Sequence, residues 1–380
     1  MSDNKTCSTK KNQIVKLGDI LEVLTDYHSN GSYKTLKENV TLLEQPNFAI
    51  MIRTTNFEKN DFRKNLIYIN QQAYNFLSKS KVLHQDILIN KIANAGAVYF
   101  MPRLDKPVSL GMNLFLLRIK KNYNKYFIFC ILKYNEKRLR LMAKGTTTKT
   151  ITKDNIKMFQ ILLPPLETQQ KIARTLSILD QKIENNHKIN ELLHTIAYKI
   201  YEYYFKYKPK NAKLEQIIIE NPKSSIMVKN AQKTQDKYPF FTSGDNMLSY
   251  PKAIIDGRNC FLNTGGNAGI KFYVGKASYS TDTWCICANE FSDYLYLLLS
   301  SIKNHINQSF FQGTSLKHLQ KNLLKKYPIY MPSAHEIKKF NQIIMPLLTL
   351  ISINTRTSKK LEQIRDFLLP LLLKQQVKPQ

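Results

Sequence analysis

The chain is 380 residues long and strongly basic, with 57 Lys and Arg against 28 Asp and Glu and a net charge of +29. AT-rich coding would raise Lys, but it would also raise Asp and Glu, so the cationic excess favours a polyanionic partner such as a nucleic acid. The most apolar stretches, 343–353 and 367–373, are too short to span a bilayer, and the N-terminus lacks the apolar core of an export signal. Five cysteines without a regular spacing argue against a disulfide scaffold, so we expect a cytoplasmic protein with reduced thiols.

The first predicted domain covers residues 1–163 and mixes strands with helix. Short β-prone runs bounded by Gly, Pro or Asn predict strands at 87–89, 97–100 and 114–117. Apolar residues three and four apart predict a helix over 123–141. A Gly-Thr loop then leads to Pro164-Pro165, which opens the next element because proline suits the first turn of a helix.

A long helix is predicted within residues 164–210. Its apolar residues alternate steps of four and three, which is the spacing of a heptad seam, and one polar layer interrupts them. Roughly 33 residues at about 1.5 Å each would extend for about 50 Å, enough to hold two domains apart. The seam consists of Ile172, Leu176, Leu179, Ile183, Asn186, Asn190, Leu193, Ala197, Ile200 and Tyr204.

A second domain over 211–332 and a second helix over 333–380 follow the same plan. This domain has a predicted strand at 270–274 and a predicted helix at 293–308. Pro346 and Pro370 lie inside the second helix and predict kinks or early fraying. Its seam consists of Phe340, Ile344, Leu347, Ile351, Asn354, Ser358, Leu361, Arg365, Leu368 and Leu372.

Two matches in the same order indicate an internal duplication. Residues 145–164 recur at 313–332, with Gly, Thr, Lys and the closing Pro in register, and the pattern Asn-x3-Asn-Ala-Gly at 90–96 recurs at 263–269. The two offsets, 168 and 173, differ by five residues, as expected if a loop insertion separates two related domains. We therefore predict an α+β fold in which two homologous mixed α/β domains are separated by two long antiparallel coiled-coil helices. The alternative is that each amphipathic helix packs only on its own domain.

Polar and cationic groups in the repeated loops are the predicted nucleic-acid contacts. Hydroxyl and ammonium groups beside glycine suit phosphate anchoring, whereas Asn amides and an Arg fork can read base edges. Solvated loops or structural turns would explain any single one of them equally well. The predicted phosphate contacts are Lys144, Thr146, Thr147, Thr148, Lys149, Gln312, Thr314, Ser315 and Lys317, and the predicted base contacts are Arg53, Asn90, Lys91, Asn94, Asn263, Thr264, Asn267, Tyr279 and Thr281.

Signatures of catalysis are weak throughout the sequence. Pro164-Pro165 lacks the flanking residues of the [DN]-P-P-[YF] tetrapeptide of adenine methyltransferases. Gly265-Gly266-x-x-Gly269 leads into a β-prone run and lacks the lysine of a phosphate-binding loop. Cys285-x-Cys287 has no second pair at metal-ligand spacing, so no metal site is expected.

The stretch from Leu163 to Phe205 resembles the central conserved region of the DNA specificity subunits of type I restriction-modification systems. The matching positions include the PPL opening at 164–166, the QQ-x-IA run at 169–173, the LD-x2-I element at 179–183 and the N-x-x-L element at 190–193. The second copy departs from the pattern, because Ser333-Ala334-His335-Glu336-Ile337 replaces the proline-rich opening.

This resemblance implies a DNA reader without chemistry of its own. Two target recognition domains would each read half of a bipartite duplex DNA site, and the helices would set the half-site spacing and dock methyltransferase subunits. The resemblance also places S-adenosylmethionine, ATP and Mg on the partner methyltransferase and restriction subunits and none on this chain. Two alternatives stay open, a self-contained DNA methyltransferase or nuclease with degenerate motifs and a basic scaffold that binds RNA or a membrane surface.

Overall fold

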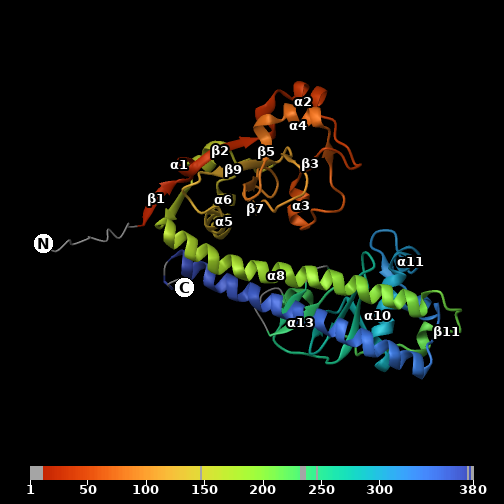
Figure 1. The fold of residues 1–380 in the computed structure, drawn as a ribbon. Coiled ribbons are helices and arrows are strands. Elements are labelled where there is room, and N and C mark those ends of the chain that lie inside the picture. Colours follow the sequence, from red (N-terminus) through yellow and green to blue (C-terminus); the bar gives the residue numbers. More distant parts are fainter. Residues whose placement is uncertain (1–11, 146–147, 232–236, 245–246, 375, 378–380) are drawn as a thin grey trace. The chain divides into compact units, whose positions relative to one another are not determined.

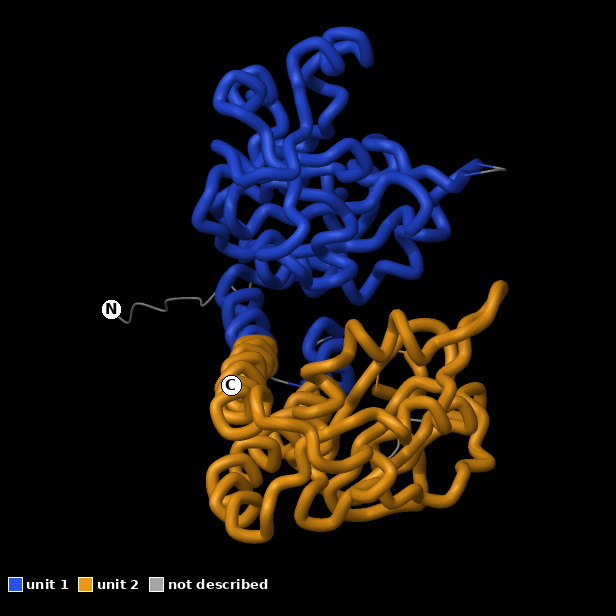
Figure 2. The backbone as a smooth tube through the Cα atoms, turned by 90° about the vertical axis from the view of Figure 1, so that its right-hand side faces the viewer, with its two compact units in different colours: residues 1–179, 365–380 blue, residues 180–364 orange. Residues whose placement is uncertain are grey.

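The computed structural model describes residues 12–145, 148–231, 237–244, 247–374 and 376–377. The chain divides into two compact units, residues 1–179 with 365–380 and residues 180–364 (Figure 2). The division passes through both long helices, α8 (Leu166–Tyr201) and α13 (Ala334–Leu373), so each unit contains part of each helix.

Unit 1 contains two four-stranded sheets with short helices packed around them. One sheet has the order β2-β9-β6-β7, the other has the order β4-β3-β8-β5, and β1 pairs with β10 just before α8. The strands are β1 (Gln13–Lys16), β2 (Leu21–Asp26), β3 (Ala49–Ile52), β4 (Tyr68–Ile69), β5 (Lys81–Val82), β6 (Ile87–Asn90), β7 (Val98–Phe100), β8 (Val108–Leu110), β9 (Leu114–Ile119) and β10 (Gln160–Leu163). The helices are α1 (Leu17–Ile20), η1 (Tyr27–Asn30), α2 (Tyr33–Asn39), α3 (Thr54–Glu58), α4 (Gln71–Phe76), η2 (Ser78–Ser80), α5 (Lys125–Tyr134), α6 (Glu136–Leu141) and α7 (Lys153–Met158).

Unit 2 has sheets of corresponding order. One is β12-β18-β15-β16, another is β14-β13-β17, and β11 pairs with β21 just before α13. The strands are β11 (Ala212–Lys213), β12 (Ile219–Glu220), β13 (Tyr238–Phe241), β14 (Leu248–Tyr250), β15 (Arg258–Asn263), β16 (Ile270–Val274), β17 (Ser278–Tyr279), β18 (Thr283–Cys287), β19 (Phe311–Gln312), β20 (His318–Leu319) and β21 (Pro328–Ile329). The helices are η3 (Glu202–Lys206), η4 (Leu214–Gln216), α9 (Val228–Ala231), η5 (Asn289–Phe291), α10 (Ser292–Ser301), α11 (Lys303–Ser309) and α12 (Lys321–Lys325).

The shared topology confirms the internal duplication. In each unit a short strand near the start of the domain pairs antiparallel with the strand that precedes a long helix. Each unit also has a parallel pair, β3 with β8 in unit 1 and β13 with β17 in unit 2, inside an otherwise antiparallel arrangement. A parallel pair needs a crossover connection, so finding it at the same place twice is not a product of local sequence preference.

The predicted antiparallel pairing of the long helices is confirmed within unit 2, where α8 and α13 lie side by side (Figure 1). The amide of Asn186 donates to the Ser358 hydroxyl at 3.2 Å, and Asn354 donates to Asn190 at 2.9 Å. Residue numbers rise on one helix as they fall on the other, which is the antiparallel arrangement. The polar layer predicted from the heptads therefore pairs with itself, which fixes the register of the two helices.

The helices also belong to the cores of the units. In unit 2 Phe340, Ile344 and Phe205 are buried in one cluster with residues of α10 and β15. In unit 1 Ile172 and Leu176 are buried with residues of α5 and β9. The alternative of packing on the domain thus holds in part, because the same helices both pair and cover a sheet.

Two local predictions were wrong. The predicted helix 123–141 is broken at Asn135, whose backbone leaves the helical region at φ −90° and ψ 13° and whose side chain also donates to the Ile131 carbonyl. The predicted helix 293–308 is broken at Ile302, which departs from helical geometry at φ −104° and ψ 15° between α10 and α11. Pro346 and Pro370 do not end α13, which continues to Leu373.

Candidate nucleic-acid interface

Loops from four places in unit 1 meet at one edge of its sheets. We call residues 53–56, 91–97, 111–113, 144–145 and 148–150 the first rim. Because β3 and β8 are parallel, their last residues lie at the same edge, and the Gly111 amide donates to the Ile52 carbonyl at 2.8 Å. The Lys91 amide donates to the Asn113 carbonyl at 2.8 Å, and the Ile151 amide donates to the Lys91 carbonyl at 3.1 Å.

Unit 2 builds a second rim from residues 242–244, 264–269, 280–282 and 312–318. The Ser280 amide donates to the Phe241 carbonyl at 2.9 Å, and the Thr264 amide donates to the Asp282 carbonyl at 3.2 Å. The Gly266 amide donates to the Lys317 carbonyl at 2.9 Å. Within each unit these bonds join the same set of loops. The two units therefore share one backbone scaffold but carry different side chains on it.

The loop with the repeated Gly-Thr sequence is a tight hairpin in both units. Lys144 and Thr150 exchange two backbone hydrogen bonds of 2.9 Å, and Gln312 pairs with His318 at the corresponding place. Gly145 has φ 136° and Gly313 has φ 139°, values that favour glycine. A Cβ atom on Gly313 would lie 2.4 Å from the Leu316 carbonyl oxygen, and one on Gly145 would lie 2.3 Å from the carbonyl oxygen three residues on. The shared Gly is therefore a requirement of the hairpin.

A cluster of charged residues around the buried Asp26 contacts the first rim through Lys91. Asp26 accepts from Lys91 at 2.6 Å and from Lys153 at 2.8 Å, and Ser29 donates to it as well. Burial alone would raise the pKa of Asp26, but the bonds from the two ammonium groups and Ser29 outweigh it and hold the pKa well below its usual range. Two cations on one carboxylate leave a net positive charge under the rim.

A lysine of β16 also binds the second rim. Lys271 Nζ donates to the carbonyl oxygens of Thr242 and Gly244 at 2.6 Å and to the Asn263 side chain at 3.3 Å. The Thr264 hydroxyl donates to the Asp282 carbonyl at 2.7 Å. The second rim is therefore also built around a cation.

Those predicted phosphate contacts that the structure describes lie on the hairpins and face solvent. Of those in unit 1, Thr146 and Thr147 lie outside the described residues. The exposed members are Lys144, Thr148, Lys149, Gln312, Thr314, Ser315 and Lys317. Asn267 and Thr281 are exposed on the second rim as well.

Several predicted base contacts are instead occupied inside the fold. Asn90 and Asn263 are 2% and 6% exposed, and each amide binds neighbouring rim residues. Tyr279 is buried and donates to the Pro222 carbonyl oxygen. These side chains are therefore engaged inside the fold, Asn263 with the Asn267 carbonyl of its own loop and Asn90 with the Thr54 hydroxyl.

The remaining predicted contacts are partly engaged. Lys91 is bound to Asp26, and Asn94 accepts a hydrogen bond from Arg140. Arg53 immediately precedes α3 at the N-cap position, and its guanidinium donates to the Asn65 carbonyl at 3.2 Å. Thr264 is half-buried and holds Asp282.

The sequence prediction missed the rim residues Met112, Asn113, Thr242 and Ser243, and it missed Lys271, which binds the second rim from β16. Met112 is 50% exposed in the loop that follows β8. The Ser243 hydroxyl accepts from the Thr264 amide at 3.2 Å. No repeated motif marks these loops, because the two copies share their backbone course and not their side chains.

The predicted helix-interface residues are spread along α8 and α13, and hydrogen bonds between the two helices involve Asn186 and Asn354 among them. The buried ones are Ile172, Leu176, Ile183, Phe340, Ile344 and Ile351, and the partly buried ones are Leu179, Asn186, Leu193, Ile200, Leu347, Asn354, Leu361 and Leu368. In the part of the chain that the structure describes, no group of three His, Cys, Asp or Glu could hold a metal ion. No helix among the described residues is long and apolar enough to cross a membrane.

The fold and its two rims define a duplicated basic protein with paired long helices. A family model for the type I restriction modification DNA specificity domain matches residues 9–195 and 210–363, and the chain belongs to this family. The specificity subunit of type I restriction enzyme MjaIX from Methanocaldococcus jannaschii is 24% identical over 279 residues, which are 62% of this chain and 64% of that protein. The HindI specificity subunit from Haemophilus influenzae is 31% identical over 105 residues, 27% of this chain and 21% of that protein. The chain spans less than two thirds of the length of these curated relatives.

A solved structure shares the fold. The crystal structure of a type I restriction-modification system S subunit from M. genitalium covers 98% of both chains with a TM-score of 0.60 at 16% identity.

Proposed function

We propose that this protein is the DNA specificity subunit of a type I restriction-modification complex. Each rim reads one half of a bipartite site in duplex DNA. The observation that carries the proposal is one loop scaffold built twice with different side chains on a chain of net charge +29. A shared scaffold suits a shared ligand such as the phosphate backbone, and differing side chains suit two different base sequences.

In this proposal the subunit is not catalytic. Methylation and cleavage, with S-adenosylmethionine, ATP and Mg, belong to methyltransferase and restriction subunits that dock on α8 and α13, and a cytoplasmic location fits this role. The exposed apolar residues of the helices support such docking, because large apolar surface in water marks contact sites. They include Ile189, Leu192 and Ile196 on α8 and Ile353, Ile364 and Phe367 on α13.

The helices also set the distance between the half-sites. Their polar layer supports this role, because Asn186 with Ser358 and Asn190 with Asn354 allow one register. A length fixed by paired helices converts directly into a number of base pairs.

Insertion of one heptad into α8 after Asn186, with a matching heptad in α13 after Asn354, tests the proposal. The insertion adds about 10 Å, or roughly three base pairs, while the seam is preserved. Mapping methylated bases in cells that contain the whole complex should give the same half-sites with a longer nonspecific spacer. A changed half-site with an unchanged spacer would contradict the proposal.

The two alternatives predict different binding by the isolated chain. S-adenosylmethionine binding by the purified protein, measured by calorimetry, would favour a self-contained methyltransferase. Preference for RNA or for anionic vesicles over duplex DNA in filter-binding and flotation assays would favour a basic scaffold. The specificity-subunit proposal requires neither S-adenosylmethionine binding by this chain nor a preference for RNA or vesicles over duplex DNA.

A further inference from the structure

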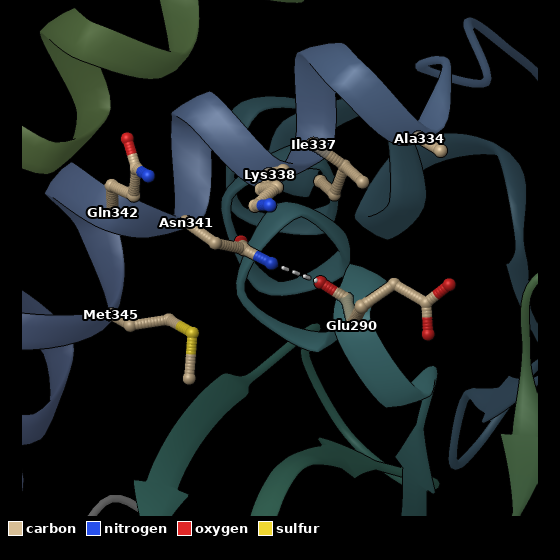
Figure 3. A pocket seen from close by; sticks show the side chains of 7 residues that line it. All are labelled: Glu290, Ala334, Ile337, Lys338, Asn341, Gln342 and Met345. Atoms are coloured by element: carbon tan, nitrogen blue, oxygen red, sulfur yellow. Dashed lines mark hydrogen bonds between the residues drawn. The ribbon is translucent and has the colours of Figure 1, made fainter.

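A row of polar contacts joins α13 to the sheet and helix of unit 2. The row occupies residues 341–352 of α13, at steps of three and four, so it forms one stripe on the helix. The Asn341 side chain donates to the Glu290 carbonyl at 2.8 Å, beside a pocket of about 400 Å³ that Met345 also lines (Figure 3). The Val274 amide of β16 donates to the Ser352 hydroxyl at 3.0 Å.

Arg258 occupies the centre of this row. Its guanidinium donates to both carboxylate oxygens of Asp293, with the Nε to Oδ2 distance at 2.5 Å. The same group reaches α13, donating to the Thr349 hydroxyl at 2.9 Å and to the Met345 carbonyl at 3.2 Å. Asp293 is 1% exposed, so the pair is shielded from water.

Apolar contacts alone would not fix this docking. Ile344, Leu348 and Ile351 bury the facing side of α13, and the hydrophobic effect that holds them has no preferred direction. A shift of the helix by one turn, about 5.4 Å, would exchange one apolar side chain for another. The same shift would break the bonds from Arg258 to Thr349 and the Met345 carbonyl and would leave the Val274 amide without Ser352, which is costly in a desolvated place.

We propose that this polar row, centred on Arg258, is a positioning element that fixes the second rim on α13 and thereby restricts the spacer length that the protein accepts. The inference rests on the proposed function and deepens it. A slip of one helical turn equals between one and two base-pair rises of about 3.4 Å, so disruption of the row relaxes the spacer by that amount. The register of α8 against α13 determines the mean length of the DNA spacer between the half-sites. The polar row determines how far an accepted spacer can depart from that mean.

Two variants test the row in cells that contain the complete complex. Thr349→Val with Ser352→Ala removes the two hydrogen bonds that these side chains accept from Arg258 and Val274, together with the bond from Ser352 to Leu348 inside α13, and leaves the Arg258–Asp293 pair intact. Arg258→Lys keeps a cation beside Asp293 and removes the fork that reaches α13. Thr357→Val is the matched control, because Thr357 is exposed and its hydroxyl donates at 2.9 Å to the Ile353 carbonyl of its own helix.

The measured quantity is the ratio of methylation at sites with a spacer altered by one or two base pairs to methylation at native sites. We expect both test variants to raise this ratio by roughly 30-fold, which corresponds to the loss of two hydrogen bonds between α13 and the rest of unit 2, with both half-site sequences unchanged. Thr357→Val should leave the ratio at the wild-type value.

Other outcomes separate the positioning role from the function on which it rests. A wild-type methylome without a bipartite motif would overturn the proposed function itself. A bipartite wild-type motif, with unchanged spacer ratios in both test variants, would overturn the positioning role alone. If Arg258→Lys melts well below the wild type, the milder double variant decides the question.

Discussion

Replacing Gly313 by Ala tests how the second hairpin is held in place. Gly313 has φ 139°, and its Cβ would lie 2.4 Å from the Leu316 carbonyl oxygen, so both the backbone angle and the contact oppose a side chain. The angle alone costs roughly 1–3 kcal/mol for a residue with a Cβ. The close contact adds to this unless the hairpin changes shape.

The hairpin can escape the strain by detaching from the rim, which limits the total cost. Detachment breaks the bonds from Gly266 to Lys317 and from Leu319 to Thr264, each contributing about 1 kcal/mol. The free energy of unfolding should therefore fall by about 2 kcal/mol, with the hairpin opened locally. For a unit of this size that corresponds to about 4–8 °C in Tm.

Gly266→Ala is the control in the same rim. Gly266 has φ 78° with no atom within 4 Å of a built Cβ, and the corresponding residue of unit 1, Ala93, already has φ 63°. This substitution should cost about 1 kcal/mol, the low end for a residue in the left-handed region.

Hydrogen exchange of the Leu319 amide and thermal melting measure both variants. We expect Gly313→Ala to speed exchange of that amide roughly 30-fold, which corresponds to about 2 kcal/mol less protection, and to weaken DNA binding by the complex. Equal melting of the Gly313 and Gly266 variants, with unchanged exchange at Leu319, would refute the strain assigned to Gly313.

Three further predictions concern charge and register. The low folded-state pKa of Asp26 contributes stability that is present above its unfolded value of about 4 and is lost as the pH falls from there towards the folded-state pKa, so Asp26→Asn should flatten the melting profile below about pH 4 and lower Tm at pH 7. Lys149→Ala and Lys317→Ala should each reduce the salt slope of DNA binding by about 0.9 for each phosphate that the lysine neutralises, whereas an altered base preference would argue against phosphate anchoring. Replacing Asn190 and Asn354 together by Leu should raise Tm but broaden the spacer distribution in the methylome, and a sharp native spacer would contradict the register role.

The sequence by itself determined the long helices, their pairing and the duplication. Heptad spacing can be recognised in the sequence alone. The polar layer, with Asn186 and Asn190 on α8 and Asn354 and Ser358 on α13, indicates which turns of the two helices face each other. Strands such as β6 and β9 were also predictable, because short apolar runs end at turn residues. The Gly of each hairpin was visible as a repeat, and its backbone angle explains why it recurs.

Only the tertiary structure decided which rim residues are free to meet a ligand. Asn263 and Asn267 look alike in sequence, yet one is buried and closes a loop while the other faces solvent. Arg258 and Asp293 are 35 positions apart, and Thr349 is a further 56 positions along the chain, so no periodic pattern connects them. Side-chain partnership across sheets depends on strand order and register, and those are set by the packing of the whole core rather than by any local run of residues.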